Sequence, residues 1–318
     1  MFTNALTAVA TMLILMGVGC FFAWKGYLAE EGNRLLSALV VRAALPGTIL
    51  STMLTTFTRG ELLGSAYLLI VPVSNMLIWA FAARWFAKLI RVPEKRQGVF
   101  TALCAFSNTV FIGFPVVRAV IGEIGIPYAT AYYLANTTMF WVVGVGEIQR
   151  DGTNQPTIAA GFGQVVVTTL KRLVSPPFVT LMISIILVLI GATLPAPIMN
   201  AASSIGGLVT PLSMIFIGSM LFNALRGGFK WERGFGALLL VRYMLAPTLT
   251  LASCLLLGVR GLPAQVFVLQ TGMATMTQVA IIAHGYGADG EYASLGVAVS
   301  TISLMIALPL IALALPLI

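Results

Sequence analysis

The chain has 318 residues, of which 59% are hydrophobic and 9% charged, and its mean hydropathy is +0.99. A soluble domain of this length cannot bury so much apolar surface, so the composition excludes a soluble protein and indicates an integral membrane protein. The net charge of +8 does not indicate a nucleic-acid partner, because the basic residues lie in short loops between apolar runs and fix the membrane orientation instead.

Ten apolar runs follow one another along the chain, each close to the roughly 20 residues that cross about 30 Å of hydrocarbon. They lie near residues 4–24, 35–57, 62–83, 98–117, 127–147, 174–194, 202–222, 235–257, 263–285 and 292–315. Each run predicts one membrane-spanning helix. The first is expected to be a retained span, because no Lys or Arg precedes Lys25 to form the basic start of a signal peptide.

Basic residues are shared unevenly between the two sets of loops. The loops after the odd-numbered spans hold thirteen Lys and Arg residues, and the opposite loops hold only Arg59, Arg118 and Arg260. The positive-inside rule therefore predicts that the thirteen lie in the cytoplasm and that both termini lie outside it. We expect a multi-pass protein of a bacterial cytoplasmic (inner) membrane.

The polar stretch 149–172 predicts a cytoplasmic linker between two halves, 1–148 and 173–318, of five spans each. Because five is odd, a duplicated second half must be inverted relative to the first. Some matching pieces support a duplication: Tyr128-Ala129-Thr130 with Asn136-Thr137 in the first half, and Tyr292-Ala293-Ser294 with Ser300-Thr301 at the same spacing in the second. Many secondary transporters are inverted repeats of this kind.

One span in each half carries polar residues at mid-depth. Residues 107–115 read Ser-Asn-Thr-Val-Phe-Ile-Gly-Phe-Pro, and residues 270–278 read Gln-Thr-Gly-Met-Ala-Thr-Met-Thr-Gln. A helix in lipid satisfies its own backbone hydrogen bonds, so Gly, Pro, amides and hydroxyls at this depth are costly without a function. The usual function is a broken helix that presents polar groups to a solute. The two segments therefore predict a transport site.

Over its whole length the chain resembles the auxin efflux carrier family, and within it the bacterial malonate and malate permeases. The most specific pieces are Ser107-Asn108 with Gly113-x-Pro115, and Tyr286-Gly287-Ala288-Asp289 leading into Ala293-Ser294 and Ser300-Thr301. The resemblance implies an all-α membrane fold similar to bile-acid and sodium symporters. That fold has ten transmembrane helices in two inverted five-helix repeats, with broken crossing helices four and nine.

The resemblance also implies a scaffold from spans 1, 2, 6 and 7, a transport domain from spans 3–5 and 8–10, and a homodimer. The chain departs from the family at Thr277, where a proline is common in span nine. The sequence leaves open whether that span breaks without it, although Gly272 and neighbouring hydroxyls favour a turn.

Candidate substrate-binding residues are the mid-depth polar and helix-breaking ones: Asn108, Gly113, Pro115, Asn136, Thr275, Thr277, Gln278, Ser300 and Thr301. Past Gly113 and Pro115, the second half of span four is expected to begin with unpaired N–H groups that attract a carboxylate. The amides can donate hydrogen bonds to the same anion. Interhelical hydrogen bonding that stabilises the bundle is the alternative role for these side chains.

Three further residues are candidates for a counter-ion or a titrating group. Arg42 and Arg242 each lie about eight residues inside a cytoplasmic helix end, where the side chain either reaches back to the interface or faces an acidic substrate. His284 is the single histidine and lies near the cytoplasmic end of span nine. It is either a titrating group or an ordinary interfacial histidine.

We therefore expect a secondary transporter or facilitator of small organic anions (carboxylates, auxin-like or malonate/malate-like) that works by alternating access around a mid-membrane site. Nothing in the sequence indicates an enzyme, a cofactor or a metal site. The expected partners are the anion, membrane lipid, and either H⁺ or Na⁺. A sodium-coupled organic anion symporter and a non-transporting ligand-binding sensor remain alternatives, and the direction of transport stays open.

Overall fold

The computed structural model describes residues 2–64, 66–152, 176–226, 228 and 230–317. Its α-helices are, in chain order, α1 (Phe2–Trp24), α2 (Glu30–Leu39), α3 (Leu45–Thr56), α4 (Arg59–Gly64), α5 (Ile70–Leu89), α6 (Gln97–Ala105), α7 (Phe114–Val120), α8 (Ile126–Met139), α9 (Val145–Asp151), α11 (Pro176–Ile190), α12 (Ala196–Gly206), α13 (Val209–Arg226), α14 (Phe235–Leu240), α15 (Ala246–Leu256), α16 (Leu262–Thr271), α17 (Gln278–Gly285) and α18 (Gly290–Ala314). Short 3₁₀ turns lie at Ala66–Leu69, Glu94–Arg96, Glu123–Gly125 and Leu315–Leu317, and π-helical turns at Val40–Ala44, Thr109–Gly113, Phe140–Gly144 and Val241–Leu245. The described residues contain no β-strand, so the prediction of an all-α protein is confirmed for them.

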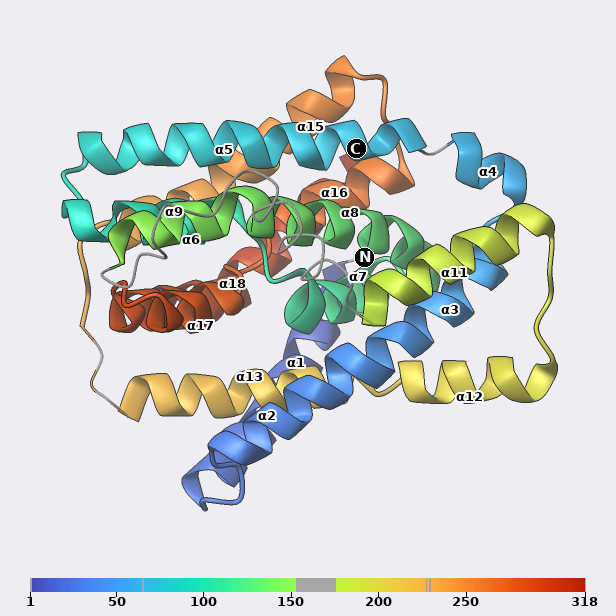
Figure 1. The fold of residues 1–318 in the computed structure, drawn as a ribbon, viewed down its shortest axis with the longest axis horizontal. Helices are drawn as coiled ribbons and strands as arrows, with labels where there is room; N and C mark the ends of the chain where they lie inside the picture. The colour runs from blue at the N-terminus through green and yellow to red at the C-terminus, as the bar shows by residue number, and fades with distance from the viewer. Residues whose placement is uncertain (1, 65, 153–175, 227, 229, 318) are drawn as a thin grey trace, which may run out of the picture.

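Many of the helices run along the long axis of the molecule (Figure 1). Five stretches are long and apolar enough to cross a membrane by length and composition: Glu31–Thr55, Tyr67–Leu89, Ala196–Asn223, Phe235–Leu256 and Gly290–Ala314. Shorter apolar helices lie at Ala10–Trp24, Thr109–Val120 and Pro176–Ile190. Large apolar side chains point outward, and Phe81 and Leu256 are 78% and 86% exposed, which suits contact with lipid. These features support a multi-pass membrane protein.

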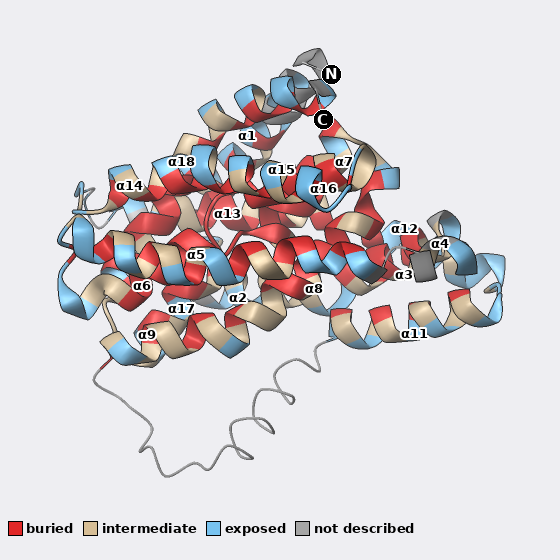
Figure 2. Cartoon of the chain, turned by 90° about the horizontal axis from the view of Figure 1, so that it is seen from above, coloured by how far each residue is buried: buried red, intermediate tan, exposed pale blue. Residues whose placement is uncertain are grey.

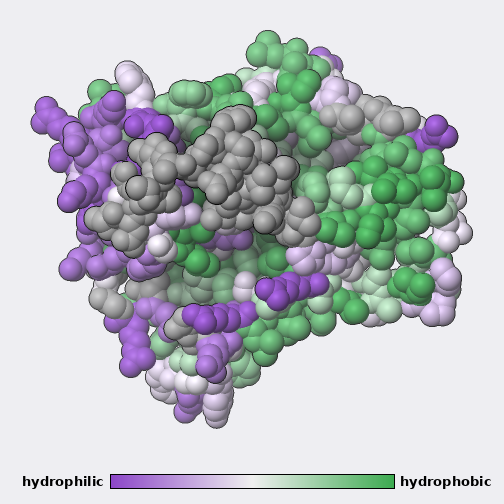
Figure 3. Space-filling view, in the orientation of Figure 1, coloured by the Kyte–Doolittle hydropathy of each residue, from purple (hydrophilic) through white to green (hydrophobic). Residues whose placement is uncertain are grey.

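Hydrophilic side chains gather at one end of the molecule, on the left of Figure 3. At this end Arg96 donates to Asp289 at 2.7 Å and to Glu232 at 2.8 Å, and so connects the start of α6 to the start of α18 and to the loop before α14. Arg84 on α5 donates to Glu147 on α9 at 3.1 Å. We call the end defined by these five residues the charged end. Its ion pairs hold neighbouring helix ends together.

Three of the four π-helical turns end two residues before a proline. The turns ending at Ala44, Gly113 and Leu245 precede Pro46, Pro115 and Pro247, respectively. A proline inside a helix has no N–H to donate and its ring crowds the carbonyl four residues earlier. The wider π-helical turn accommodates that carbonyl, so each helix continues past its proline instead of ending.

Glycine allows α1 and α13 to pack with their backbones in contact. A Cβ on Gly19 would lie 2.1 Å from the carbonyl oxygen of Ile215, and one on Gly218 would lie 2.0 Å from that of Met16. Neither position can hold a larger residue without separating the helices. Small residues at such a crossing are the usual basis of helix association in lipid.

Buried residues run through the middle of the molecule, shown in red in Figure 2. In α6 every residue from Gly98 to Ala105 is buried, and in α16 every residue from Val266 to Thr271 is buried. Both helices are short and end inside the core, which leads to the site described next. The predicted linker 149–172 falls mainly on residues 153–175, which lie outside the described residues. The division into 1–148 and 173–318 therefore stays a prediction.

Candidate functional site

Two helix interruptions meet at the centre of the molecule. One separates α6, which ends at Ala105, from the helix that restarts at Thr109, and the other separates α16 from α17. Ser107 and Thr275 form an antiparallel β-bridge between them. The N–H of Asn108 donates to the carbonyl of Ala274 at 2.8 Å, and the N–H of Met276 donates to that of Phe106 at 3.0 Å. Two N–H groups and two carbonyls that leave the helical hydrogen-bond pattern are thus paired between the interruptions.

The interruptions lie where the sequence predicted them, with two differences in detail. The second helix ends at Thr271 and restarts at Gln278 without any proline, because Gly272 follows its last turn and the first interruption supplies backbone partners. The first restarts at Thr109 and not after Pro115, so Gly113 and Pro115 lie inside the second half of the helix. Since α6 has nine residues and α16 has ten, each interruption lies about 14 Å from the start of its helix at about 1.5 Å per residue.

Arg242, in the π-helical turn between α14 and α15, is buried beneath the crossing and is 1% exposed. Its guanidinium donates to the carbonyls of Cys104 at 3.1 Å, Thr271 at 2.9 Å and Met273 at 3.1 Å. Cys104 and Thr271 belong to the last turns of α6 and α16. The cation therefore lies at the negative ends of two helix dipoles. Of the cavities described below, neither has Arg242 among its described lining residues.

A side chain from a following helix holds each of the two bridged residues. Asn136 on α8 accepts from the Ser107 N–H at 3.1 Å and donates to the Ser107 carbonyl at 3.0 Å. Ser300 on α18 accepts from the Thr275 N–H at 3.1 Å. Both side chains are fully buried. In this structure Asn136, Ser300 and Thr275 therefore build the crossing and do not face open space.

A cavity of about 170 Å³ lies beside the crossing. Its lining comprises Val41, Ser107, Asn108, Thr109, Val110, Phe111, Tyr133, Thr137, Trp141, Met276, Thr277 and Gln278. We call it the crossing cavity. The first turns of both restarted helices, at Thr109 and Gln278, border it. None of these described lining residues is charged.

Four of the lining residues carry a buried polar atom without a hydrogen-bond partner. These atoms are Asn108 Nδ2, Thr109 Oγ1, Thr137 Oγ1 and Gln278 Oε1. The other end of the Asn108 amide is used, because its Oδ1 accepts from the Phe111 N–H at 3.1 Å and caps the restarted helix. Buried polar atoms in proteins are usually hydrogen-bonded. Because four residues that line one cavity each carry such an atom, we take the crossing cavity as the candidate site.

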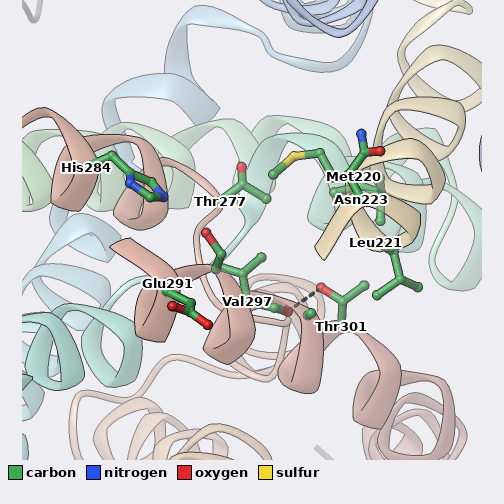
Figure 4. Close-up of a pocket in the computed structure, with 11 residues that line it drawn as sticks. Met220, Leu221, Asn223, Thr277, His284, Glu291, Val297 and Thr301 are labelled. Carbon is green, nitrogen blue, oxygen red and sulfur yellow. Dashed lines mark hydrogen bonds between the residues drawn. The ribbon is translucent and has the colours of Figure 1, made fainter. Parts of the chain in front are cut away.

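A larger cavity of about 430 Å³ lies between α13 on one side and α17 and α18 on the other. Figure 4 shows His284 and Glu291 toward one end, and Thr277 and Thr301 farther in. The former two are exposed, whereas Thr277 and Thr301 are 3% and 2% exposed. Thr277 also lines the crossing cavity. The larger cavity thus extends from the charged end toward the crossing, and we call it the vestibule.

The remaining sequence candidates take up other positions. A Cβ on Gly113 would lie 2.1 Å from Oε1 of Gln270, so the missing side chain leaves room for that buried amide. Pro115 is buried in α7. Arg42 is exposed and lines neither the crossing cavity nor the vestibule.

Sequence reasoning did not select Thr109 and Thr137 as site residues, although each follows a residue that it did select. Neighbouring residues of a helix point in different directions, so both members of such a pair are not expected at one site. The interruption removes that restriction, since Asn108 caps the restarted helix and Thr109 begins it. For Thr137 the signal was its place beside Asn136 in the matched spacing of the two halves.

Two interrupted helices that cross beside a polar cavity inside an apolar bundle define a class of proteins that carry solutes through membranes. The chain matches the family described as membrane transport protein over residues 4–312, and it belongs to that family. The family-level prediction is thereby confirmed, while the malonate and malate detail stays a prediction.

Two similar proteins extend over nearly the same length. An uncharacterised transporter of Methanothermobacter thermautotrophicus is 27% identical over 315 residues, which cover 97% of this chain and 98% of that protein. An uncharacterised transporter of Methanocaldococcus jannaschii is 25% identical over 287 residues, which cover 88% and 89%. Both names give the class and no substrate. They support a transporter.

Proposed function

We propose that the protein is a secondary transporter or facilitator that moves small organic anions by alternating access around the crossing cavity. The observation that carries this proposal is that four residues lining one cavity, Asn108, Thr109, Thr137 and Gln278, each have a polar atom without a partner. A carboxylate that accepts from Asn108 Nδ2 and from the two threonine hydroxyls would remove the cost of burying these three donors. Gln278 Oε1 is an acceptor and would need a donor group on the solute. No step of the proposal is enzymatic.

The polarity of the crossing supports an anion. The restarted helices begin at the cavity, so their positive N-terminal ends face it, whereas the C-terminal ends of α6 and α16 face Arg242. Asn108 Nδ2 and the hydroxyls of Thr109 and Thr137 can all donate to a carboxylate. The cavity is smaller than the roughly 300–1,000 Å³ of pockets for drug-sized ligands, which favours a small solute.

We further propose ten membrane crossings in two inverted halves of five. Asn136 and Ser300 occupy matched positions in the two halves and hold the bridged residues Ser107 and Thr275, respectively. Such equivalent contacts are expected of a duplicated fold. The packing of α1 against α13 and of α3 against α12 supports a scaffold of spans 1, 2, 6 and 7.

The vestibule supports a direction of opening. The positive-inside rule assigns the charged end to the cytoplasm, so the conformation described here would be open inward. α13 of the scaffold forms one wall, and α17 and α18 of the transport domain form the other. Movement of one against the other would close this path and expose the crossing cavity on the far side.

The test is flux into liposomes that contain the purified protein, with a panel of labelled mono- and dicarboxylates under H⁺ and Na⁺ gradients. Asn108→Ala should lower uptake at least tenfold. Asn75→Ala is the matched control, because Asn75 on α5 is also buried but lines neither cavity. Binding without flux in the wild-type protein would favour a sensor and overturn the proposal, and full uptake by Asn108→Ala would remove the site.

A further inference from the structure

Among the described residues, Arg242 is the only charged side chain that is buried. The described ion pairs involve other residues: Arg84 and Arg150 with Glu147, Arg96 with Asp289 and Glu232, and Arg118 with Glu123. The partners of Arg242 are carbonyls and one hydroxyl. These dipoles stabilise the guanidinium but do not cancel its charge. Within the part of the chain that the structure describes, one positive charge without an ionic partner therefore lies beneath the crossing.

This charge lies one side chain away from the crossing cavity. The guanidinium Nη2 of Arg242 donates to Ser107 Oγ at 2.7 Å. Ser107 lines the crossing cavity beside Asn108 and Thr109, two of the residues with partnerless donors. An anion held by those donors would thus face the cation across a single hydroxyl. At the intermediate dielectric constant of a protein interior, two charges this close still attract each other appreciably.

We propose that Arg242 is the counter-charge of the transported anion and acts through Ser107 without touching the solute, so that the site selects solutes with a single negative charge. This inference rests on the proposed function and names the charge class of its substrate. It also gives Arg242 two effects. The guanidinium lies at the negative ends of α6 and α16 and so weakens their repulsion of an anion, and its own formal charge attracts the anion.

Charge selection follows from the balance inside the membrane. One monoanion leaves the occupied site electrically neutral, whereas a dianion leaves one net negative charge and a neutral solute leaves the positive charge uncompensated. A net charge at mid-membrane is unfavourable. No described residue that lines the crossing cavity can offset a second negative charge. A carboxylate should therefore bind more tightly than its uncharged amide and more tightly than a dicarboxylate of similar size.

The experiment compares solutes of matched size on the full-length protein in lipid nanodiscs. Each set contains a monocarboxylate, its amide and a dicarboxylate: propionate, propionamide and malonate, or butyrate, butyramide and succinate. Calorimetric titration gives the affinity of each, and the readout is the ratio of carboxylate to amide affinity. A structural defect weakens both solutes alike and leaves this ratio unchanged. Loss of the counter-charge lowers it.

Wild-type protein should prefer the monocarboxylate over its amide by roughly 10- to 100-fold, the effect of one charge at close range in a medium of intermediate dielectric constant. Arg242→Gln keeps hydrogen-bond donors but removes the charge, and should abolish most of this preference. Arg242→Lys keeps the positive charge but lacks the planar guanidinium. It should therefore retain the preference for the carboxylate even if the affinities for the carboxylate and its amide both fall. Arg42→Gln is the matched control, since Arg42 lies in another π-helical turn and is exposed.

The outcomes separate the two proposals. A wild-type protein that binds no carboxylate in the panel overturns the proposed function, and the inference with it. Binding that favours the dicarboxylate, or an unchanged preference in a folded Arg242→Gln protein, overturns the inference alone. Equal loss of preference in the Lys and Gln variants also contradicts it, because the charge would then not be the cause. If Arg242→Gln does not fold, two results still contradict the inference. One is a wild-type protein without preference for the carboxylate over its amide, and the other is loss of that preference in a folded Arg242→Lys protein.

Discussion

Ser107 and Thr275 face each other across an antiparallel bridge in which neither residue belongs to a helix. Each bridged N–H donates to a side chain from a later helix, Asn136 in one case and Ser300 in the other. The two interruptions and these two side chains therefore form one hydrogen-bonded unit, in which each bridged residue also bonds to a side chain from a third segment. This unit positions the candidate site, because Asn108, Thr109 and Gln278 follow the bridged residues in the chain and line the crossing cavity.

Ser300→Ala should destabilise the crossing, because it leaves the buried N–H of Thr275 without its acceptor. An unsatisfied buried donor costs about 1–3 kcal/mol. We expect a lower thermal unfolding temperature in detergent and reduced carboxylate uptake, since Thr277 and Gln278 follow directly in the chain.

Ser74→Ala is the control for this substitution, because Ser74 Oγ bonds only the carbonyl of Val71 within its own helix at 3.0 Å. It should change neither quantity appreciably. Equal stability of the Ser300→Ala and Ser74→Ala proteins would show that the Thr275 N–H finds another partner, and the role given to Ser300 would then be wrong.

The positions of both interruptions could be predicted from sequence. In lipid a polar cluster with glycine has few explanations other than a broken helix, so residues 107–115 and 270–278 carried a strong signal. The second interruption was less certain without a proline at Thr277, and the structure shows why none is needed. Its carbonyls and N–H groups are satisfied by the first interruption and by Arg242.

Side-chain direction could not be predicted in the same way. Asn108 and Asn136 have the same chemistry at a similar depth, yet the Nδ2 of Asn108 has no partner and Asn136 uses both ends of its amide on Ser107. Arg242 and Arg42 lie at similar distances from a helix end, yet one is buried and the other exposed. Which face each helix turns inward depends on packing between distant segments, and spacing along the chain does not contain that information.

Gly19→Val and Gly17→Val form a matched pair on α1. A Cβ at Gly19 would collide with the carbonyl of Ile215, whereas nothing lies within 4 Å of one at Gly17. Overpacking of this kind costs about 1–3 kcal/mol or more, so the Gly19 variant should unfold at a lower temperature than the Gly17 variant. Similar unfolding temperatures for the two proteins would contradict the close approach of α1 and α13.

Asp151, at the end of α9 beyond the span, should make stability depend on pH. Burial raises the pKa of its carboxyl above the ordinary 3.8, and this outweighs the lowering by hydrogen bonds from the Val99 and Gly98 N–H groups. The folded protein then binds more protons than the unfolded chain between the ordinary and the raised pKa. Stability should therefore fall as pH rises through that window.

Asp151→Asn removes this titration but keeps an oxygen for the Val99 N–H, which donates to Asp151 Oδ2 at 2.7 Å. Unfolding temperatures measured from pH 4 to 8 should decline less for this variant than for the wild-type protein. Parallel curves for the two proteins would exclude Asp151 as the cause.

Cysteine labelling tests both the orientation and the path through the vestibule. Ser294 on α18 lines the vestibule toward the charged end, and Arg260 is exposed in the loop before α16. In a background with the three native cysteines replaced by alanine, the Ser294→Cys protein should react with a membrane-impermeant maleimide only in inside-out vesicles. The Arg260→Cys protein should react only in intact cells.

A Thr301→Cys protein should react from the same side as Ser294→Cys, but more slowly, because Thr301 lies deeper and is 2% exposed. Labelling of Ser294→Cys in intact cells alone would reverse the orientation derived from the basic residues, and the vestibule would then open outward.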